Sequence, residues 1–207
     1  MIGRMIRDAT RADAGAMYRI CRLTGDAGAD ATPLHSAPDL LGEVYVGPYL
    51  NRPPAAALVG LDDSGEPIGY ALGTPDSAAF ADACEAQWWP ELRARYPLPE
   101  LGAAHPDLTP HDLALITHIR HPPVAAPDLV EPFSAHLHID LLPQAQGRGL
   151  GRALMEQLLA RLRAAGATGV HLGVDPQNTS AVRFYEHLGF RRWGTEPDVV
   201  TLVLSFA

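Results

Sequence analysis

A glycine-rich turn between an expected strand and an expected helix constrains the fold of this chain more than any other feature. The turn reads Leu141-Leu-Pro-Gln-Ala-Gln-Gly-Arg-Gly-Leu-Gly-Arg152, and it lies between a strand pattern over 135–142 and a leucine stripe over 149–165. Glycines let the backbone approach a ligand closely, and the first N–H groups of a helix have no partner within the helix. Strand, turn and helix in this order predict an α/β domain with a pyrophosphate site at the helix N-terminus.

The phosphate-binding motifs that compete with this interpretation fit less well. The chain contains no lysine, because all sixteen basic residues are arginine. This excludes a P-loop and lysine Schiff-base chemistry. Gly147, Gly149 and Gly151 are evenly spaced, whereas the dinucleotide fingerprint requires G-x-G-x-x-G. Phosphate recognition would therefore use backbone N–H groups, with Arg148 and Arg152 at the rim. A turn that binds nothing is the alternative.

The rest of the sequence predicts the element order of a mixed α/β fold. Thr10 and Asp13 resemble a capping box ahead of an amphipathic helix over 11–24. The other expected elements are a short strand over 6–10, a short helix near 39–46, a hairpin of strands 56–61 and 67–73, helices at 78–96 and 111–120, a strand at 169–174, a helix at 178–188 and strands at 191–193 and 199–206. Strand, turn, helix and strand in succession imply a right-handed crossover with parallel pairing. We expect one domain over 1–207, with a helical and proline-rich insertion at about 75–132.

Two segments resemble the motifs of a known enzyme family. Gln146-x-x-Gly149-x-Gly151 resembles motif A of the GNAT acetyltransferases, and the segment 178–190 resembles their motif B at the usual distance. The resemblance covers roughly residues 135–192. It implies the GNAT fold, a mixed central β-sheet with a splayed parallel strand pair, flanked by helices. It also implies acetyl-CoA as cosubstrate.

The same resemblance implies how CoA is bound. The residues that would hold its pyrophosphate are Gln146, Gly147, Arg148, Gly149, Leu150, Gly151 and Arg152. Pantetheine would lie in the gap between strands 135–142 and 169–174, paired with backbone groups of Leu141 and Leu142. Asn178 would help to fix it there.

A second resemblance extends over most of the chain. The segments 18–22, 46–49 and 69–74, together with Phe184-Tyr185, resemble the acetyltransferase-like C-terminal domain of eukaryotic O-GlcNAcase. The CoA loop of that domain is degraded, whereas this sequence keeps its glycines. The resemblance leaves open a catalytically silent CoA-binding or interaction module as the alternative to an active enzyme.

Acyl transfer from a thioester to an amine requires a base, donors for the oxyanion and an acid for the thiolate. Tyr185 is the candidate acid, because in the family this tyrosine lies beside the CoA sulfur; plain core packing is the alternative. His136, His138 and Asp140 alternate on one strand and should project from one face. Ser134-Ala-His-Leu-His138 also resembles the strand of arylalkylamine N-acetyltransferases in which paired histidines pass the proton of the amine to water.

These histidines suit a base or a relay, because an unperturbed pKa near 6.5 lets imidazole accept protons at neutral pH. A solvated strand face and a metal site are the alternatives, and no third metal ligand lies at short range. Asp140 would orient a histidine or bind the cation of the acceptor, and a backbone N–H within 140–142 would hold the oxyanion. The remaining histidines of the insertion are expected at the surface: His105, His111, His118 and His121. Trp88, Trp89, Tyr45 and Tyr49 would wall an acceptor pocket or pack a core.

Composition limits the partners and the location. The formal charge is −8, which argues against a nucleic-acid partner. No apolar stretch is long enough to span a membrane, and no secretory signal begins the chain, so we expect a cytoplasmic protein. Cys21 and Cys84 fit no metal or redox spacing and are expected as buried thiols. We expect a monomer or homodimer without a bound metal, and the sequence does not reveal which amine accepts the acetyl group.

Overall fold

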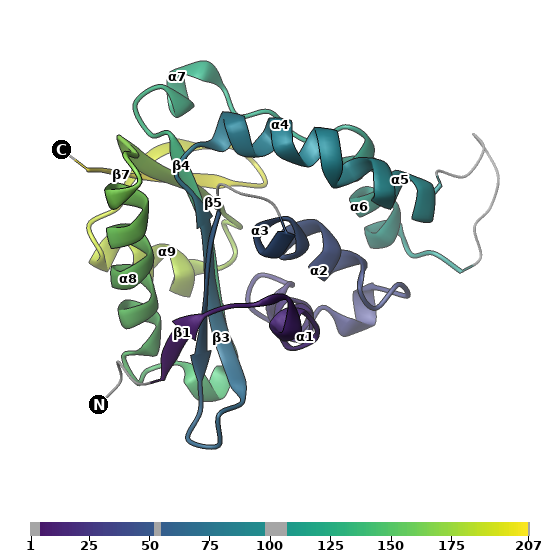
Figure 1. Cartoon of the computed structure of the whole chain (residues 1–207), viewed down its shortest axis with the longest axis horizontal. Coiled ribbons are helices and arrows are strands. Elements are labelled where there is room, and N and C mark those ends of the chain that lie inside the picture. The colour runs from purple at the N-terminus through teal and green to yellow at the C-terminus, as the bar shows by residue number, and fades with distance from the viewer. Residues whose placement is uncertain (1–4, 52–54, 98–106, 207) are drawn as a thin grey trace.

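Short apolar segments separated by turns form one mixed sheet in this chain. The computed structural model describes residues 5–51, 55–97 and 107–206. Its strands lie in the spatial order β1 (Ile6–Asp8), β2 (Ala56–Leu61), β3 (Pro67–Thr74), β4 (Ala135–Leu141), β5 (Gly169–Val174), β7 (Val200–Ser205) and β6 (Arg191–Thr195). β4 and β5 pair in parallel, and the other neighbours are antiparallel. Helices cover both faces (Figure 1), so the GNAT fold expected from the motifs is confirmed.

The leucine stripe forms α8 (Leu150–Ala164) and packs it onto one face of the sheet. Leu154, Leu158 and Leu162 are fully buried, and the helix contacts β2, β3 and β4. Each such leucine buries apolar area worth about 2 kcal/mol. Gly60 on β2 permits this contact, because a Cβ there would lie 2.9 Å from Leu150. α9 (Thr179–His187) lies on the same face (Figure 1).

The opposite face is covered by the N-terminal helices and the insertion. A 3-10 turn (Arg11–Asp13) leads into α1 (Ala14–Thr24), and the expected capping box is present, since Thr10 donates to the Asp13 carboxylate through N at 2.8 Å and Oγ1 at 2.9 Å. A further 3-10 turn (Thr32–Leu34) precedes α2 (Leu40–Tyr45) and α3 (Gly47–Asn51). The expected short helix near 39–46 is confirmed as α2, and α3 follows it as a separate helix that was not expected.

The insertion contributes α4 (Ser77–Gln87), α5 (Trp89–Arg95), α6 (Pro110–Arg120) and α7 (Pro127–Val130). The prediction of one helix over 78–96 is wrong, because the helix breaks at Trp88. Pro90 has no backbone N–H, so it cannot donate the helical hydrogen bond to the carbonyl of the residue four positions before it. Its ring also clashes with that carbonyl. The break directs the Trp88 indole to donate to the Glu43 carbonyl at 3.0 Å, which ties the insertion to α2.

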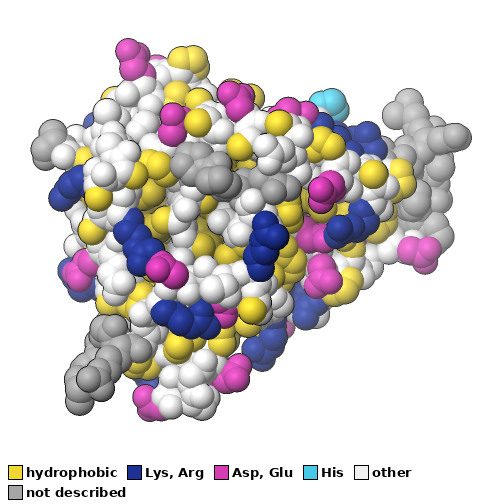
Figure 2. Space-filling model, in the orientation of Figure 1, with side chains coloured by type: hydrophobic (Ala, Val, Ile, Leu, Met, Phe, Trp, Pro, Cys, Tyr) yellow, Lys and Arg dark blue, Asp and Glu magenta, His cyan; other side chains and the backbone are white. Residues whose placement is uncertain are grey.

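Charge is dispersed over the surface. On the face drawn in Figure 2, arginines and carboxylates are interspersed rather than gathered into a patch of one sign. Within the described ranges, no helix is both long and apolar enough to cross a bilayer.

Candidate active site

The site begins where β4 and β5 separate. The two parallel strands pair only at Ala135 with Val170 and at His136 with His171. Beyond this point β4 continues beside β3, whereas β5 diverges from it. The side chains of His136, His138 and Asp140 face the helices of the insertion side, where they line cavities. Leu141 faces the other way, toward α8, because a Cβ on Gly151 would lie 2.8 Å from it.

The glycine turn is open, and its glycines are required for two different reasons. Gly147 and Gly149 have φ of 71° and 81°, a left-handed conformation that glycine adopts without strain. Gly149 is the N-cap of α8 and provides no side-chain cap, so the first N–H groups of the helix are available to an anion. Gly151 is required for packing against Leu141 and Phe184. The exposed residues of the turn are Gln146, Gly147, Arg148 and Gly149. A Cβ added at Gly147 would have no atom within 4 Å, so the space around it is open.

Other predicted CoA-binding residues differ in what they can offer. Leu142 donates its N–H to the Ile68 carbonyl at 3.0 Å, so that group is not free for pantetheine. Backbone N–H groups alternate sides along a strand, so the Leu141 N–H points into the opening. The Leu141 carbonyl accepts from Gln146 Nε2 at 3.1 Å. The side chain of Leu150 is buried, which leaves only its backbone for a ligand. Arg152 Nη1 lies 3.9 Å from Glu156 Oε1, and both side chains are exposed, so the guanidinium remains accessible to a ligand.

Asn178 caps α9 at the mouth of the opening. Its Oδ1 accepts from Ala181 N at 3.1 Å. A Cβ on Gly28 would lie 3.2 Å from Asn178 Nδ2, so the tight turn Asp26–Ala29 reaches α9 across the opening. Ala27 and Gly28 both have positive φ, 48° and 96°, as a two-residue hairpin turn requires.

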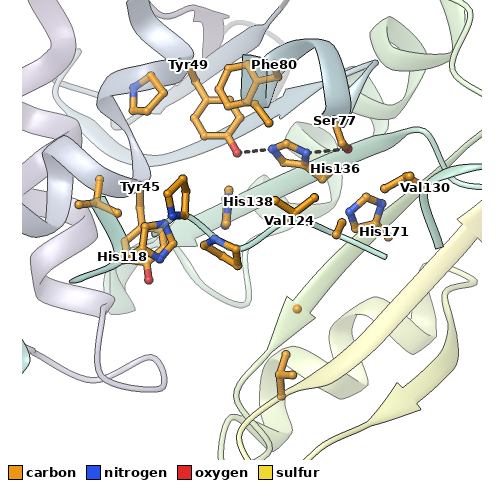
Figure 3. A pocket seen from close by; sticks show the side chains of 18 of the residues that line it. Tyr45, Tyr49, Ser77, Phe80, His118, Val124, Val130, His136, His138 and His171 are labelled. Carbon is orange, nitrogen blue, oxygen red and sulfur yellow. Dashed lines mark hydrogen bonds between the residues drawn. The ribbon is translucent and has the colours of Figure 1, made fainter. Parts of the chain in front are cut away.

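Two cavities meet at the opening. One has a volume of about 580 Å³ and lies among α2, α3, α4, α6 and the loop 122–125. We call it the aromatic cavity, because Tyr45, Tyr49 and Phe80 wall it (Figure 3). The other, of about 570 Å³, contains the predicted residues Asp140, Asn178 and Tyr185, and we call it the thioester cavity. Tyr45, His138 and residues 173–175 line both.

His136 is held in a closed chain of hydrogen bonds. Ser77 Oγ donates to the Ser134 carbonyl at 2.8 Å, so it must accept the proton of His136 Nδ1, also at 2.8 Å. Tyr49 OH then donates to His136 Nε2 at 2.7 Å (Figure 3). Burial, with His138 and His171 nearby, holds the pKa of His136 well below its ordinary value. The chain ends at a backbone carbonyl that can pass no proton on. His136 therefore orients Tyr49, and its role as a base or relay stays a prediction.

His138 lies where the two cavities join. Its ring contacts Tyr45, Tyr49 and His136, at centroid distances of 6.1, 5.7 and 6.3 Å. Burial, together with His118 and His171, lowers its pKa to about 4. The pKa values of both predicted histidines thus lie below that of an unperturbed imidazole. His138 is neutral at physiological pH, with a lone pair available on its ring.

Asp140 is a carboxylate within a hydroxyl cluster. It accepts hydrogen bonds from Tyr70 OH and, at 3.1 Å, from Thr24 Oγ1. Burial raises its pKa despite these donors. No hydrogen bond to a histidine accompanies them among the described contacts of Asp140, so its predicted role in orienting a histidine is not supported. Its predicted role as an anchor for a cation agrees with its place in the thioester cavity.

Tyr185 faces the same cavity from α9. Its ring packs against Phe184 and Phe190. Burial, followed by the negative charge of Asp140, raises the pKa of its hydroxyl. Tyr185 therefore keeps its proton at neutral pH and can donate it to a leaving group.

Sequence reasoning missed three histidines of the site. His118 was expected at the surface, but it is half-buried against Tyr45 and Trp89 and lines the aromatic cavity, which gives it a lowered pKa through burial. His171 donates Nδ1–H to the Phe133 carbonyl at 2.8 Å. His35 bonds the buried Asp112 carboxylate at 2.9 Å and lines the thioester cavity. Of these three histidines, only His171 could have been placed near the site in advance, because parallel pairing of β5 with β4 puts it beside His136. His111 and His121 are exposed as expected, and His105 lies outside the described residues.

Metal ligation finds no support among these side chains: the described residues contain no group of three or more His, Cys, Asp or Glu placed to hold an ion. Cys21 and Cys84 are buried thiols outside any disulfide, as expected.

Comparison with known proteins supplies an independent view. A family model described as "Acetyltransferase (GNAT) family" matches residues 114–190. The crystal structure of SsHAT is 36% identical, with a TM-score of 0.85 over 98% of each chain. The crystal structure of a GNAT superfamily phosphinothricin acetyltransferase from Sinorhizobium meliloti, in complex with AcCoA, has a TM-score of 0.55 over 97% of this chain and 86% of its own. At 19% identity, that likeness concerns the fold alone.

Curated relatives match over a shorter segment. A mycothiol acetyltransferase of Nocardiopsis dassonvillei is 48% identical over 66 residues, which are 32% of this chain. The matched segment is only 20% of that relative's length.

Proposed function

The chain belongs to the acetyltransferase (GNAT) family, and on that premise we propose that it moves the acetyl group of acetyl-CoA to a primary amine by direct attack in a ternary complex. The observation that carries the proposal is the opening between β4 and β5. An exposed glycine turn with free helix N–H groups lies on one side of it, and two cavities lie on the other. A ligand that reaches from a phosphate site to an enclosed acceptor site fits this arrangement.

The glycine turn suits the pyrophosphate of CoA. The open space around Gly147 admits phosphate oxygens to the backbone N–H groups, and Arg148 and Arg152 add positive charge at the rim. Pantetheine would run along the unpaired edge of β4 beside the backbone of Leu141 and Leu142, and Asn178 Nδ2 would lie beside it. No lysine is needed for this mode of binding.

The reaction exchanges one acyl bond for another. The lone pair of the amine attacks the thioester carbonyl carbon, the C–N bond forms, and collapse of the tetrahedral species breaks the C–S bond. The Leu141 N–H is the donor we propose for the oxyanion. Tyr185 gives its proton to the departing thiolate. Of the two protons that the ammonium nitrogen loses, the first passes to His138 before the attack and from there to water, and the second restores the Tyr185 hydroxyl after the C–N bond has formed. The products are an amide, free CoA and one released proton. Asp140 holds the ammonium before it is deprotonated.

Several finer points stay proposals. The mycothiol acetyltransferase relatives suggest a mycothiol precursor as one acceptor, and the segment in which they match covers 32% of this chain. None of the relatives named above is an O-GlcNAcase, so that closer resemblance is a prediction, as is the catalytically silent module that it suggests. One domain over 1–207, a cytoplasmic location, a monomer or homodimer and the absence of a nucleic-acid partner are predictions of the same standing.

Two measurements test the function together. Calorimetry should detect acetyl-CoA binding to the full chain, and a thiol assay should detect CoA release with at least one member of an amine panel. Binding without release on any amine would favour the silent module, and the absence of both would overturn the proposal.

A further inference from the structure

We propose that the aromatic cavity is the acceptor site, and that the acceptor is a small primary amine whose remaining part is apolar, ring-sized and uncharged. This inference rests on the proposed function and names its substrate class. It follows from the lining of the cavity, its charge, its rim and its position.

The lining of the cavity is largely apolar. The Tyr49 and Phe80 rings stack at a centroid distance of 4.6 Å and form one wall. The hydrogen bond from Tyr49 to His136 fixes that wall, because it leaves the phenol no other orientation. Further apolar residues of the lining include Val44, Pro48, Ala81, Val130, Val174 and Val199. A ring or alkyl chain placed there is removed from water and gains about 25 cal/mol for each Å² buried.

The cavity carries little charge. Its lining includes no arginine among the described residues, and its one carboxylate, Asp175, is exposed. Burial lowers the pKa of each of its four histidines, His118, His136, His138 and His171, so all four are neutral. A second cation or a polyhydroxylated ring would lose its hydration here without charged partners, which is costly.

The rim of the cavity is apolar as well. Val124, on a loop between two prolines and an alanine, has 88% of its surface exposed and lines the entrance (Figure 3). Its neighbours Pro122, Pro123 and Ala125 also line the cavity, so this edge of it is continuously apolar. The volume of about 580 Å³ suits a small molecule rather than a folded protein segment.

The position of the cavity places the amine at the reaction centre. Tyr45 and His138 separate it from the thioester cavity. An acceptor whose apolar part lies against Phe80 would direct its nitrogen toward His138 and the opening. The thioester cavity is more polar at its far end, where His35 and Asp26 contribute, so it offers a poorer place for an apolar substituent.

The test compares amines and then one pair of variants. CoA release is measured with 2-phenylethylamine and hexylamine, and with glucosamine and spermidine as polar and polycationic probes. We expect kcat/KM for the apolar amines to exceed that for the polar ones by about tenfold or more, the discrimination that loss of a few apolar contacts gives.

Ala81→Glu places a carboxylate in the cavity, and Ala79→Glu is the matched control. Both alanines are exposed on α4 and only Ala81 lines the cavity, so both variants should fold. We expect Ala81→Glu to lower kcat/KM for 2-phenylethylamine about tenfold, without changing the Kd for acetyl-CoA, and Ala79→Glu to stay within about twofold of wild type. If glucosamine or spermidine matches the apolar amines, or if Ala81→Glu has no effect, the inference is wrong while the acetyltransferase function stands. If no amine releases CoA, the proposed function itself fails.

Discussion

His136 and His138 are two residues apart on one strand face, and their neighbours give them different roles. His136 has a partner on each ring nitrogen, Ser77 and Tyr49, so it fixes a wall of the cavity. The described contacts of His138 are with other rings, and it faces both cavities. Sequence spacing could place both side chains on one face, but it could not distinguish a satisfied imidazole from an available one.

Replacing Tyr185 with Phe tests the proposed acid. The ring packing against Phe184 and Phe190 would be kept, and only the hydroxyl would be lost. We expect kcat to fall about 100-fold, a typical contribution of general acid catalysis, while the Kd for acetyl-CoA changes less than about twofold. Thiol release and calorimetry measure the two quantities. Wild-type kcat in this variant would end the assignment.

The pH profile tests the environment of His138. A base must be deprotonated to act, and with a pKa lowered to about 4 His138 is already neutral at about pH 5.5. The acid must be protonated, and the raised pKa of Tyr185 keeps it so beyond about pH 9. We therefore expect kcat at saturating substrates to show no break between about pH 5.5 and 9. An ordinary histidine would instead reduce kcat about tenfold from its plateau at about pH 5.5, and a break near 6.5 would contradict the burial of the base.

At the scale of elements, the glycine turn offers an internally matched experiment. Gly147 and Gly65 both have positive φ, 71° and 90°, and a Cβ added at either would have no atom within 4 Å. Replacing either with Glu introduces the same backbone strain and the same charge. Gly147→Glu should weaken acetyl-CoA binding at least about tenfold, because a charge at an anion site repels the diphosphate. Gly65→Glu, in the β2–β3 hairpin, should bind normally. Equal affinities would remove the phosphate role of the turn.

Patterns of neighbouring residues predicted most helices and strands, whereas contacts between residues distant in the sequence form the walls of the cavities. The Thr10–Asp13 capping box, the buried α8 stripe and the bounds of β5 each depend on neighbouring residues and are confirmed. The break at Trp88 could have been predicted from Pro90. The cavity walls could not, because Tyr45, His118 and His171 meet there only after folding brings three separate segments together.

At the scale of the whole molecule, buried carboxylates link stability to pH. Hydrogen bonding to Arg7, opposed by burial and aided by Thr10, lowers the pKa of Asp13. Burial alone would raise the pKa of Asp112, but donors from Ser36, His35 and Thr109 lower it on balance. A carboxyl with a depressed folded-state pKa stabilises the fold above its unfolded pKa, near 3.9, and loses that contribution as pH falls.

We therefore expect Tm to fall as pH is lowered from about 5 to about 3. Asp112→Asn should cost about 3 kcal/mol at neutral pH, as loss of one partner from a buried pair does, and should reduce the pH dependence of Tm. Asp63→Asn, at an exposed position in the hairpin turn, is the control and should leave both unchanged. Calorimetry across this range and urea unfolding at neutral pH measure the effects. An unaltered pH dependence in Asp112→Asn would show that acid sensitivity arises elsewhere.

The two-residue pairing of β4 with β5 has a mechanical consequence. Within the described strands, backbone pairing between β4 and β5 is limited to Ala135 with Val170 and His136 with His171, so beyond these pairs strand hydrogen bonds do not join the two parts of the sheet. A pantetheine chain lying in the gap would act as a substitute strand and would stiffen the sheet there. In our proposal the bound cosubstrate thus completes the sheet of the enzyme that consumes it. The sheet would be stiffer while acetyl-CoA is bound and looser after CoA has left.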